Sequence, residues 1–546
     1  MKKSHIQQVS RWLVLSVFVF VGASHCRAEQ RLYNGIVLPD EWPPKTEQLT
    51  RETMRVPYLE SPPAVVPIDV GRQLFVDDFL IEHTTLTRTF HQAEYYPKNP
   101  VLKPDKPWEI GTSSGGHPAP TAMVFSDGVW YDPQDKLFKM WYMGGYTLAT
   151  CYATSKDGIT WEKPALDVKA GTNVVHQGQR DSATVWLDLE EKDPAKRFKL
   201  FVTQSTPHGW AIFVHLSPDG IHWGEPAAVS TPVGDRTTVF YNPFRKVWVY
   251  SIRCGVAELG RARRYREHAD PVSGAHWQSD EAPLWIGADR LDPPRPDLMV
   301  TPQLYNLDAV AYESLLLGLF TIWPGQPNDR AKLNYVCLGF SRDGFHWHRP
   351  DHRPFIGVSE NYGDWNWGNV QSAGGGCLVV GDKSLRDKLY FYVSGRAGVR
   401  GSSASGVCST GLATLRRDGF ASMDGGLAEG TLTTRCVRFN GKYLFVNVDS
   451  DAGECRAEVL DETGQLMAPF SRDNCLPISA DKTLQSVSWK GASDLAVVAD
   501  NPVKFRFYLR NGQLYAFWVS PDRSGASHGY VAAGGPGLTT AHSSLP

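Results

Sequence analysis

One ten-residue phrase recurs three times in this chain. The copies are "SKDGITWEKP" (155–164), "SPDGIHWGEP" (217–226) and "SRDGFHWHRP" (341–350), and their Asp residues are separated by 62 and then 124 residues. A unit of about 60 residues therefore repeats, and a degenerate copy is expected between the second and third phrases, at 264–278. A unit of this length suits the four-stranded blade of a β-propeller.

Five hairpin-like segments agree with this period. They begin near Met123, Thr184, Thr238, Ala309 and Cys377. Each joins two apolar, strand-like runs through turn residues. We therefore predict an all-β fold, with a five-bladed β-propeller over residues 70–415 and a closing strand near 72–82. The alternative is a long β-sandwich in which the phrases coincide by chance.

The repeated phrase is predicted to be architectural. Asp-Gly after a strand favours a tight turn, in which the Asp side chain accepts hydrogen bonds from turn amides. The aromatic residue that follows would then pack between blades. Asp157, Asp219 and Asp343 are accordingly predicted to be structural rather than catalytic.

The propeller is expected to have neighbours at both ends. Residues 416–523 alternate apolar and polar positions and predict an antiparallel β-sandwich, whereas 524–546 offer little to bury and predict a disordered tail. Residues 1–28 combine a basic start with a short apolar core and predict a signal peptide, followed by an N-terminal extension over 29–69. The protein is thus expected to be exported, either periplasmic or extracellular, without a membrane span.

Composition narrows the classes of partner. The formal net charge is −2 and no basic block occurs, so nucleic acid is not an expected partner. The eight cysteines beyond Cys26 include no C-x-x-C pair, which argues against a thiolate zinc site. Several lie in apolar strand-like runs, where buried free thiols are the favoured interpretation. Oligomeric state is not indicated.

Polar residues cluster where the five inner strands of the blades would begin. Asp181 and Asp235 each lie four residues before the Val of their strand, at equivalent positions of neighbouring blades. The other polar residues near these strand entries are His117, Arg180, Arg236, Asn306, Asp308 and Gln371. Because inner strands converge on the propeller axis, we expect these side chains to share one funnel.

Two carboxylates around an axis suit glycoside hydrolysis, in which one group donates a proton and the other stays ionised. The candidate catalytic residues are Asp181, Asp235, Glu313 and Glu109, although period two points Glu313 away from Asp308. The other polar residues named above, with Trp108 and Trp367 for stacking, are candidate substrate-binding residues. Turn capping, salt bridges with the arginines and inter-blade packing are the structural alternatives. No cofactor is required, and Ca²⁺ at the propeller axis is left open.

Several motifs resemble a known family. "LFVDDFLIE" (74–82), "NPVLKPDKPWE" (99–109), "FKMWYMGG" (138–145) and "GDRTTVFYNPFRKVWVYSIR" (234–253) are similar to segments of the five-bladed propeller glycoside hydrolases of the family 32/43/130-like superfamily. The segment "LTTRCVRFNGKYLFVN" (432–447) resembles the β-sandwich often joined to such propellers. The resemblance implies a glycosidase with an axial Asp as nucleophile or base, a second Asp, and a Glu acid.

The chain departs from the best-known patterns of that superfamily. It lacks "NDPNG", "RDP" and "EC" signatures, and no Glu matches Asp181 and Asp235 on another blade. The acid, and with it an inverting or retaining outcome, is left open. The leading hypothesis is an exported glycosidase acting on poly- or oligosaccharides. The alternatives are a non-catalytic glycan-binding propeller and a protein-interaction scaffold, which predicts an apolar axis.

Overall fold

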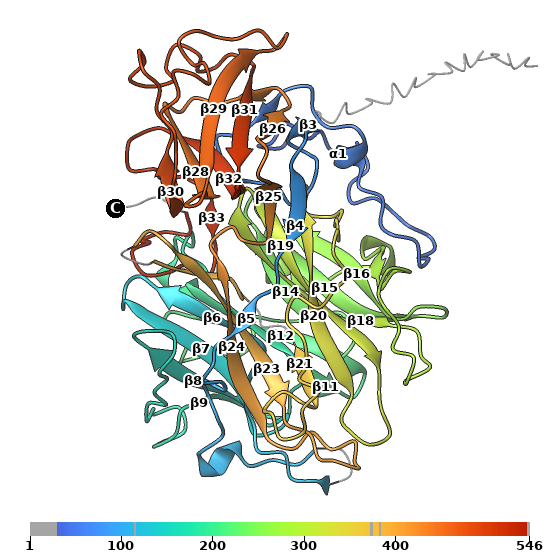
Figure 1. The fold of residues 1–546 in the computed structure, drawn as a ribbon. Coiled ribbons are helices and arrows are strands. Elements are labelled where there is room, and N and C mark those ends of the chain that lie inside the picture. The colour runs from blue at the N-terminus through green and yellow to red at the C-terminus, as the bar shows by residue number, and fades with distance from the viewer. Residues whose placement is uncertain (1–29, 114–115, 372–374, 382–383, 543–546) are drawn as a thin grey trace, which may run out of the picture.

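The computed structural model describes residues 30–113, 116–371, 375–381 and 384–542. The predicted signal peptide therefore lies outside the described residues. Regular structure is almost entirely β, in two stacked parts (Figure 1). The short helical elements are α1 (Pro57–Glu60) and the 3₁₀ turns η1 (Pro107–Glu109), η3 (Pro194–Lys196), η4 (Ser273–Ala275) and η5 (Ser279–Glu281).

Five antiparallel sheets form the larger part and confirm the predicted five-bladed propeller. Blade I contains β6 (Ala122–Asp132), β7 (Leu137–Gly144), β8 (Ala149–Ser155) and β9 (Val174–Gln177). Blade II contains β10 (Ala183–Leu187), β11 (Phe198–Thr206), β12 (Gly209–Ser217) and β13 (Ala228–Val229). Blade III contains β14 (Thr238–Asn242), β15 (Val247–Val256), β16 (Gly260–His268) and β17 (Leu284–Gly287).

The last two blades are less regular. Blade IV contains β18 (Gln303–Glu313), β19 (Leu315–Gly325) and β20 (Leu333–Ser341), and its outer edge is bridged through His348 and Ile356. Blade V contains β21 (Asn369–Gln371), β22 (Leu378–Val380), β23 (Lys388–Arg396), β24 (Cys408–Arg416) and β5 (Glu94–Tyr95). Blade V contacts β6 of blade I, which closes the ring.

The strand that closes the ring differs from the prediction. Its outer position in blade V is filled by β5, which pairs with β24. The predicted segment 72–82 instead supplies β2 (Gln73–Leu74) and part of β3 (Ile81–Thr84) to the smaller part of the molecule. Phe75 and Phe79 of this segment are buried in the core of the smaller part. Burial of these two rings therefore favours pairing of the segment with the smaller part rather than with blade V.

The repeated phrase joins neighbouring blades. In the first copy, Asp157 Oδ1 accepts hydrogen bonds from the amides of Ile159 and Thr160 at 2.8 and 2.7 Å, as the turn interpretation predicts. Tyr392 of blade V donates to the carbonyl of Gly158 at 2.5 Å. In the second copy, Trp141 of blade I donates to the carbonyl of Gly220 at 2.7 Å. Each turn is therefore bonded to the preceding blade, which explains why the phrase recurs.

The smaller part is a two-sheet sandwich, but its strands come from both ends of the chain. One sheet contains β1 (Val66–Pro67), β27 (Val437–Arg438), β31 (Val503–Arg510), β26 (Gly430–Thr434), β3 and β29 (Glu454–Asp461). The other contains β30 (Asp481–Ser486), β28 (Tyr443–Asp449), β32 (Gly512–Ser520), β25 (Ala421–Gly425), β4 (Thr87–Phe90) and β2. Residues 66–90 therefore belong with 421–520 rather than with the propeller.

The C-terminal tail is packed over its described residues, in contrast to the predicted disorder. Strand β33 (Tyr530–Val531) pairs with β18, and the carbonyls of Ala533 and Gly534 accept hydrogen bonds from blades I and V at 2.9 and 3.0 Å. The tail lies where the propeller meets the sandwich (Figure 1). Val531, Ala533 and Leu538 are buried there, so a few small apolar residues suffice to order the segment.

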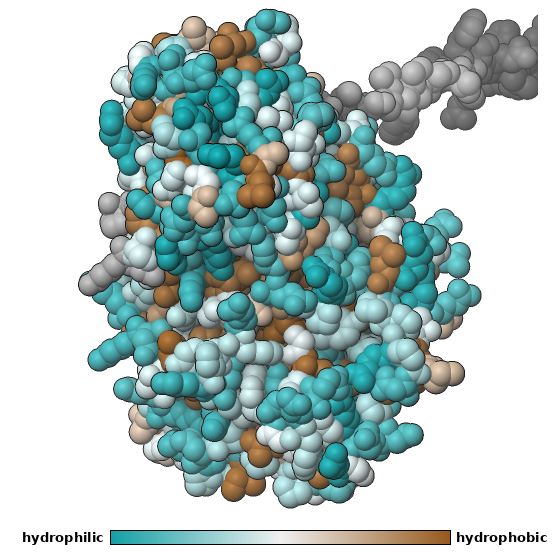
Figure 2. Space-filling view, viewed as in Figure 1, coloured by the Kyte–Doolittle hydropathy of each residue, from teal (hydrophilic) through white to brown (hydrophobic). Residues whose placement is uncertain are grey.

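The remaining general expectations concern cysteines and surface. All eight cysteines of the described chain are free thiols, six of them buried. No helix in the described residues is long and apolar enough to cross a bilayer. The face drawn in Figure 2 is mostly hydrophilic, with apolar residues scattered over it.

Candidate active site

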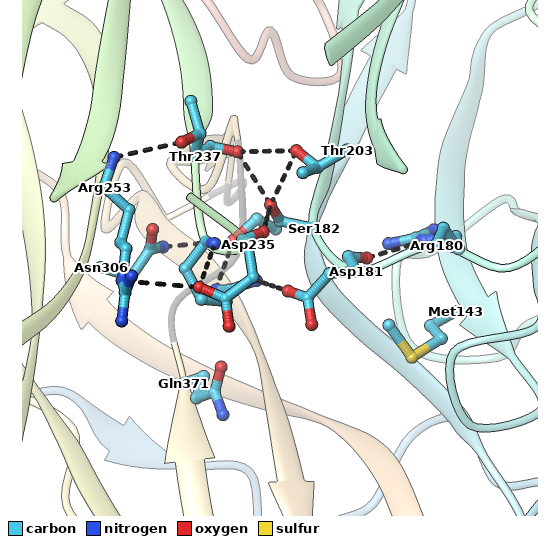
Figure 3. A network of polar contacts seen from close by, with 12 residues as sticks. Met143, Arg180, Asp181, Ser182, Thr203, Asp235, Thr237, Arg253, Asn306 and Gln371 are labelled. Atoms are coloured by element: carbon cyan, nitrogen blue, oxygen red, sulfur yellow. Dashed lines mark hydrogen bonds and ion pairs between the residues drawn. The ribbon is translucent and has the colours of Figure 1, made fainter. Parts of the chain in front are cut away.

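The inner strands β6, β10, β14, β18 and β21 bring their first residues together around the propeller axis. Hydrogen bonds cross between blades here: Ser182 Oγ donates to the carbonyl oxygens of Asp235 and Thr237 at 2.9 and 2.8 Å. Figure 3 shows Asp181 and Asp235 next to each other, with Gln371 across the gap. Side chains at the starts of the inner strands of blades II, III and V therefore lie close together, as the predicted funnel requires.

Asp181 and Asp235 differ in their surroundings. The Asp181 side chain is 22% exposed and its Oδ1 lies 3.9 Å from Arg236 Nη1, whereas Asp235 is 37% exposed and lies 3.5 Å from Arg253 Nε. Burial raises the pKa of Asp181; Arg236 opposes this shift and the charge of Asp235 adds to it. Asp181 is therefore the carboxyl that keeps its proton to higher pH than an ordinary Asp.

Arg236 lies beneath these carboxylates. Its guanidinium is buried 3.8 Å from the centre of the Phe125 ring, and its Nη2 donates to Ser126 Oγ at 3.0 Å. Its Nε and Nη1 have no hydrogen-bond partner among the described residues. Both nitrogens are buried, and Nη1 faces the Asp181 carboxylate.

Arg180 has a different role from the predicted one. Its Nη2 donates to Asp127 Oδ2 at 2.7 Å, its Nη1 bonds the other oxygen of the same carboxylate, and Thr150 Oγ1 accepts at 2.7 Å. Arg180 and Asp127 are both fully buried. The guanidinium is committed to this pair, so it positions the start of β10 rather than facing a ligand.

Sequence reasoning missed Ser126 and Asp127. The register of β6 against β7 jumps from Met123 opposite Met143 to Gly128 opposite Trp141, which forms a bulge. The bulge turns Ser126 and Asp127 toward the axis, where both are fully buried. The signal was a Ser-Asp-Gly triplet inside an otherwise apolar inner strand.

Blade IV supplies a third axial carboxylate. Asn306 Nδ2 donates to Asp308 Oδ2 at 2.8 Å and to Ser126 Oγ at 3.2 Å, and Ser126 Oγ lies 3.2 Å from the same Asp308 oxygen. Asp308 is 4% exposed, so it lies deeper than Asp181 and Asp235. Asn306 and Asp308 thus form the floor of the funnel.

A group of cations beside the carboxylates was also missed. Arg263 Nη1 donates to the carbonyl of Arg236 at 2.5 Å, and Lys332 Nζ lies 3.3 Å from Tyr305 Oη. Burial raises the pKa of Tyr305, but Lys332, Arg236 and Arg396 outweigh it, and the net pKa lies below the ordinary phenol value. The funnel is therefore positively charged around Tyr305.

The two glutamates predicted as catalytic lie elsewhere. Glu313 is at the far end of the eleven-residue β18, where its Oε2 accepts from Ser527 Oγ at 2.6 Å and its Oε1 from Arg417 Nη2 at 2.9 Å. Glu109 in η1 accepts from Tyr142 Oη at 2.7 Å and from Lys163 Nζ at 2.8 Å. Both carboxylates are fully buried in these bonds, so neither belongs to the axial group around Asp181 and Asp235.

Four predicted binding residues remain to be placed. Gln371 is buried on β21, with Nε2 donating to Asn369 Oδ1 at 3.0 Å. Trp108 donates to Asn173 Oδ1 at 2.8 Å in blade I, and Trp367 packs with its ring centre 5.1 Å from the Arg330 guanidinium. His117 is exposed on the loop before β6. Gln371 is thus the one of these four that Figure 3 places at the axis.

The axial charges suit a divalent cation poorly. Asp181 and Asp235 face Arg236 and Arg253, and Arg263 lies close by. Among the described residues, the group of possible metal ligands close enough to share an ion is Asp289, Asp292 and His352, outside the axis. Arg349 pairs with both of those carboxylates, at 3.3 and 2.5 Å, so an ion pair already occupies their oxygens.

No family model matches the chain, and no curated protein matches its sequence. Similar solved structures include an N-acetylgalactosamine deacetylase from F. plautii, at 13% identity over 59% of this chain and 97% of that one, with a TM-score of 0.39.

Two family-43 glycoside hydrolases are also similar. A thermostable one shares 11% identity over 58% of this chain and 96% of its own, with a TM-score of 0.38. One from Bacillus licheniformis shares 9% identity over 80% of this chain and all of its own, with a TM-score of 0.34. The chemistry of this chain is therefore argued from its own residues.

Proposed function

We propose that the axial pocket hydrolyses glycosidic bonds, with Asp181 as general acid and Asp235 as the ionised carboxylate. The observation that supports this most directly is the unequal environment of two neighbouring carboxyl groups. Asp181 has a raised pKa, while Asp235 is more exposed and lies beside Arg253. Acid–base hydrolysis of an acetal needs one carboxyl group that keeps its proton, and the raised pKa of Asp181 suits that role.

The chemistry then follows from the two side chains. Asp181 would donate its proton to the leaving glycosidic oxygen as the bond to the anomeric carbon breaks. Asp235 would act on the anomeric carbon, either directly or through a water that it deprotonates. Gln371 and Arg236 are fully buried, so they would position the site rather than contact sugar hydroxyl groups. With Glu313 and Glu109 placed elsewhere, Asp181 takes the acid role in this proposal.

The proposed enzyme acts outside the cytoplasm. Residues 1–28 have the composition of a signal peptide, which supports this location.

The alternative function is a glycan-binding propeller without hydrolysis. It would use the same axial residues, so binding and hydrolysis have to be measured separately.

The test compares the mature protein with Asp181→Asn and Asp235→Asn on a panel of poly- and oligosaccharides. Release of reducing sugar should fall roughly 10²- to 10⁴-fold in both variants. Asp473→Asn is the matched control, because that side chain is 91% exposed in the sandwich. Glycan binding without release, equal in all four proteins, would contradict hydrolysis and identify a binding module.

A further inference from the structure

We propose that the axial pocket selects glycans that carry an anionic group, either the carboxylate of a uronic acid or a sulfate ester, which Lys332, Arg261 and Arg396 bind. This inference rests on the proposed function, because it names the substrate class of the same pocket. It follows from an excess of cationic side chains around Tyr305 that the carboxylates of the site do not neutralise.

Three of the four axial carboxylates have arginine partners, and the fourth, Asp308, acts on Arg263 from a greater distance. Asp127 pairs with Arg180, Asp181 lies 3.9 Å from Arg236, and Asp235 lies 3.5 Å from Arg253. The remaining cations have no carboxylate at ion-pair distance in the described residues. Within the described parts of the chain, no carboxylate oxygen lies within 4.0 Å of the charged nitrogens of four residues: Arg261, Arg263, Lys332 and Arg396.

Two of these unpaired cations are buried. Arg263 is fully buried and donates only to the neutral oxygens of Arg236, Ser251, Tyr305 and Asn306. Arg396 is 4% exposed and donates to Ser405 Oγ at 3.2 Å, while its Nε has no partner in the described residues. A buried charge without a counter-charge is costly. The charge of Asp308 offsets Arg263 from a distance, and an anion from outside would supply a close counter-charge for Arg396.

The cations also perturb one another and the phenol between them. Burial, and then the neighbouring charge of Arg236, lower the pKa of Arg263 to about 9. Burial raises the pKa of Tyr305, and the charges of Lys332, Arg236 and Arg396 lower it further than burial raises it. Both shifts agree with a positive potential in the pocket, which attracts an anionic ligand.

A surface hollow lies beside the axial residues on the blade III side. A hollow of 410 Å³ is lined by Arg253, Arg261 and Gln303 on the hairpin of β15 and β16 and the start of β18. Arg253 connects it to Asp235, and the Arg261 guanidinium lies 5.2 Å from the centre of the Tyr305 ring. Lys332 is half-buried, with its Nζ 5.2 Å from the same ring. Paired guanidinium N–H groups match the oxygens of carboxylate and sulfate.

The experiment measures binding rather than cleavage, so its failure is distinct from a failure of hydrolysis. Asp235→Asn protein, which should bind without turnover, is titrated by calorimetry with a uronic acid trisaccharide and with its carboxyl-reduced counterpart. A second pair is a neutral trisaccharide with and without one sulfate ester. We expect at least one anionic ligand to bind about tenfold more tightly than its neutral partner at low salt, since charge-assisted hydrogen bonds are stronger than neutral ones.

The pair that shows the preference identifies the source of the anion. Lys332→Gln and Arg261→Gln, each added to Asp235→Asn, should reduce the preference several-fold, and higher salt should reduce it as well. Lys192→Gln, an exposed cation in the β10–β11 connection, should leave it unchanged. Equal affinity for the charged and neutral members of both pairs would overturn the inference, even if the protein hydrolyses a neutral glycan.

Discussion

Arg180 and Asp127 form a fully buried ion pair at the start of the inner strands, with Arg180 Nη2 2.7 Å from Asp127 Oδ2. Arg180 immediately precedes Asp181, and Asp127 follows Ser126, which bonds Arg236. The pair therefore connects blade I to the residue that we assign as the general acid. Burial raises the pKa of Asp127; Arg180 opposes this shift, but the net pKa stays above the ordinary Asp value.

Breaking this pair should destabilise the protein strongly. Asp127→Asn leaves the Arg180 charge buried without its partner, and loss of one member of a buried pair costs about 3 to 5 kcal/mol in the free energy of unfolding. Urea unfolding followed by tryptophan fluorescence measures the change. Arg55→Ala is the control, because the Arg55–Glu60 pair is exposed and should change the midpoint little. Equal midpoints for Asp127→Asn and the control would show that the buried pair is not needed for stability.

The raised pKa of Asp181 predicts that this residue makes the free energy of unfolding depend on pH. The folded state holds the Asp181 proton more tightly than the unfolded chain, so the free energy of unfolding falls as pH rises from the ordinary Asp pKa of about 3.9 to the raised folded value. Asp181→Asn removes this titration. The stability of the variant relative to wild type should therefore increase across that window and stay constant above it.

Urea unfolding at several pH values between about 3 and 8 measures this difference. Subtracting one protein from the other cancels the groups that titrate in both. Asp473→Asn should follow wild type at every pH, because its side chain is exposed. A constant difference between Asp181→Asn and wild type would mean that Asp181 titrates in the folded protein as it does in the unfolded chain.

The parts of the fold that could be predicted are those whose sequence pattern recurs from blade to blade. Each inner hairpin joins two apolar runs. The Asp-Gly phrase repeats because an aromatic side chain of the preceding blade donates to a carbonyl of each turn, that of Gly158, Gly220 or Phe345. Asp181 and Asp235 could be aligned because both lie four residues before a strand Val. Their shared location follows from convergence of inner strands on one axis.

The parts that were missed depend on contacts without such a signal. Strand β5 closes the ring with two residues, too few for a recognisable pattern. The bulge in β6 breaks period two, so Ser126 and Asp127 could not be assigned to a face. The sequence prediction placed Glu313 near the axis because it used the face of the strand on which Glu313 lies and not its distance along the strand. Along β18, however, at about 3.3 Å per residue, seven residues separate it from Asn306 by roughly 23 Å.

The glycine of the repeated phrase should be intolerant of a side chain. Gly220 has φ +76°, and a Cβ there would lie 2.5 Å from Trp141 Cζ2 of the preceding blade. Gly220→Ala should lower the free energy of unfolding by about 1 to 3 kcal/mol through overpacking, beyond the cost of the backbone conformation. Gly171→Ala isolates that backbone cost, since Gly171 has φ +75° with open space around it. An equal decrease in the free energy of unfolding of the two variants, measured by urea unfolding, would show that Trp141 moves to accommodate the added methyl group.

Glu313→Gln distinguishes a structural from a catalytic glutamate. Glu313 accepts from Arg417 at 2.9 Å and from Ser527 at 2.6 Å, and Arg72 lies 3.5 Å away, all buried where the propeller meets the sandwich and the tail. Removing its charge leaves two buried arginines with less compensation, so the free energy of unfolding should fall by about 3 to 5 kcal/mol. The kcat per folded molecule should not change.

Both quantities are measured on the same preparation, by urea unfolding and by reducing-sugar release at a temperature where the variant is folded. Glu462→Gln, an exposed carboxylate in the sandwich, should leave both at the wild-type value. A Glu313→Gln protein with wild-type stability and a greatly reduced kcat would contradict the assignment. The general acid would then have to act from the opposite end of β18, and Asp181 would lose that role.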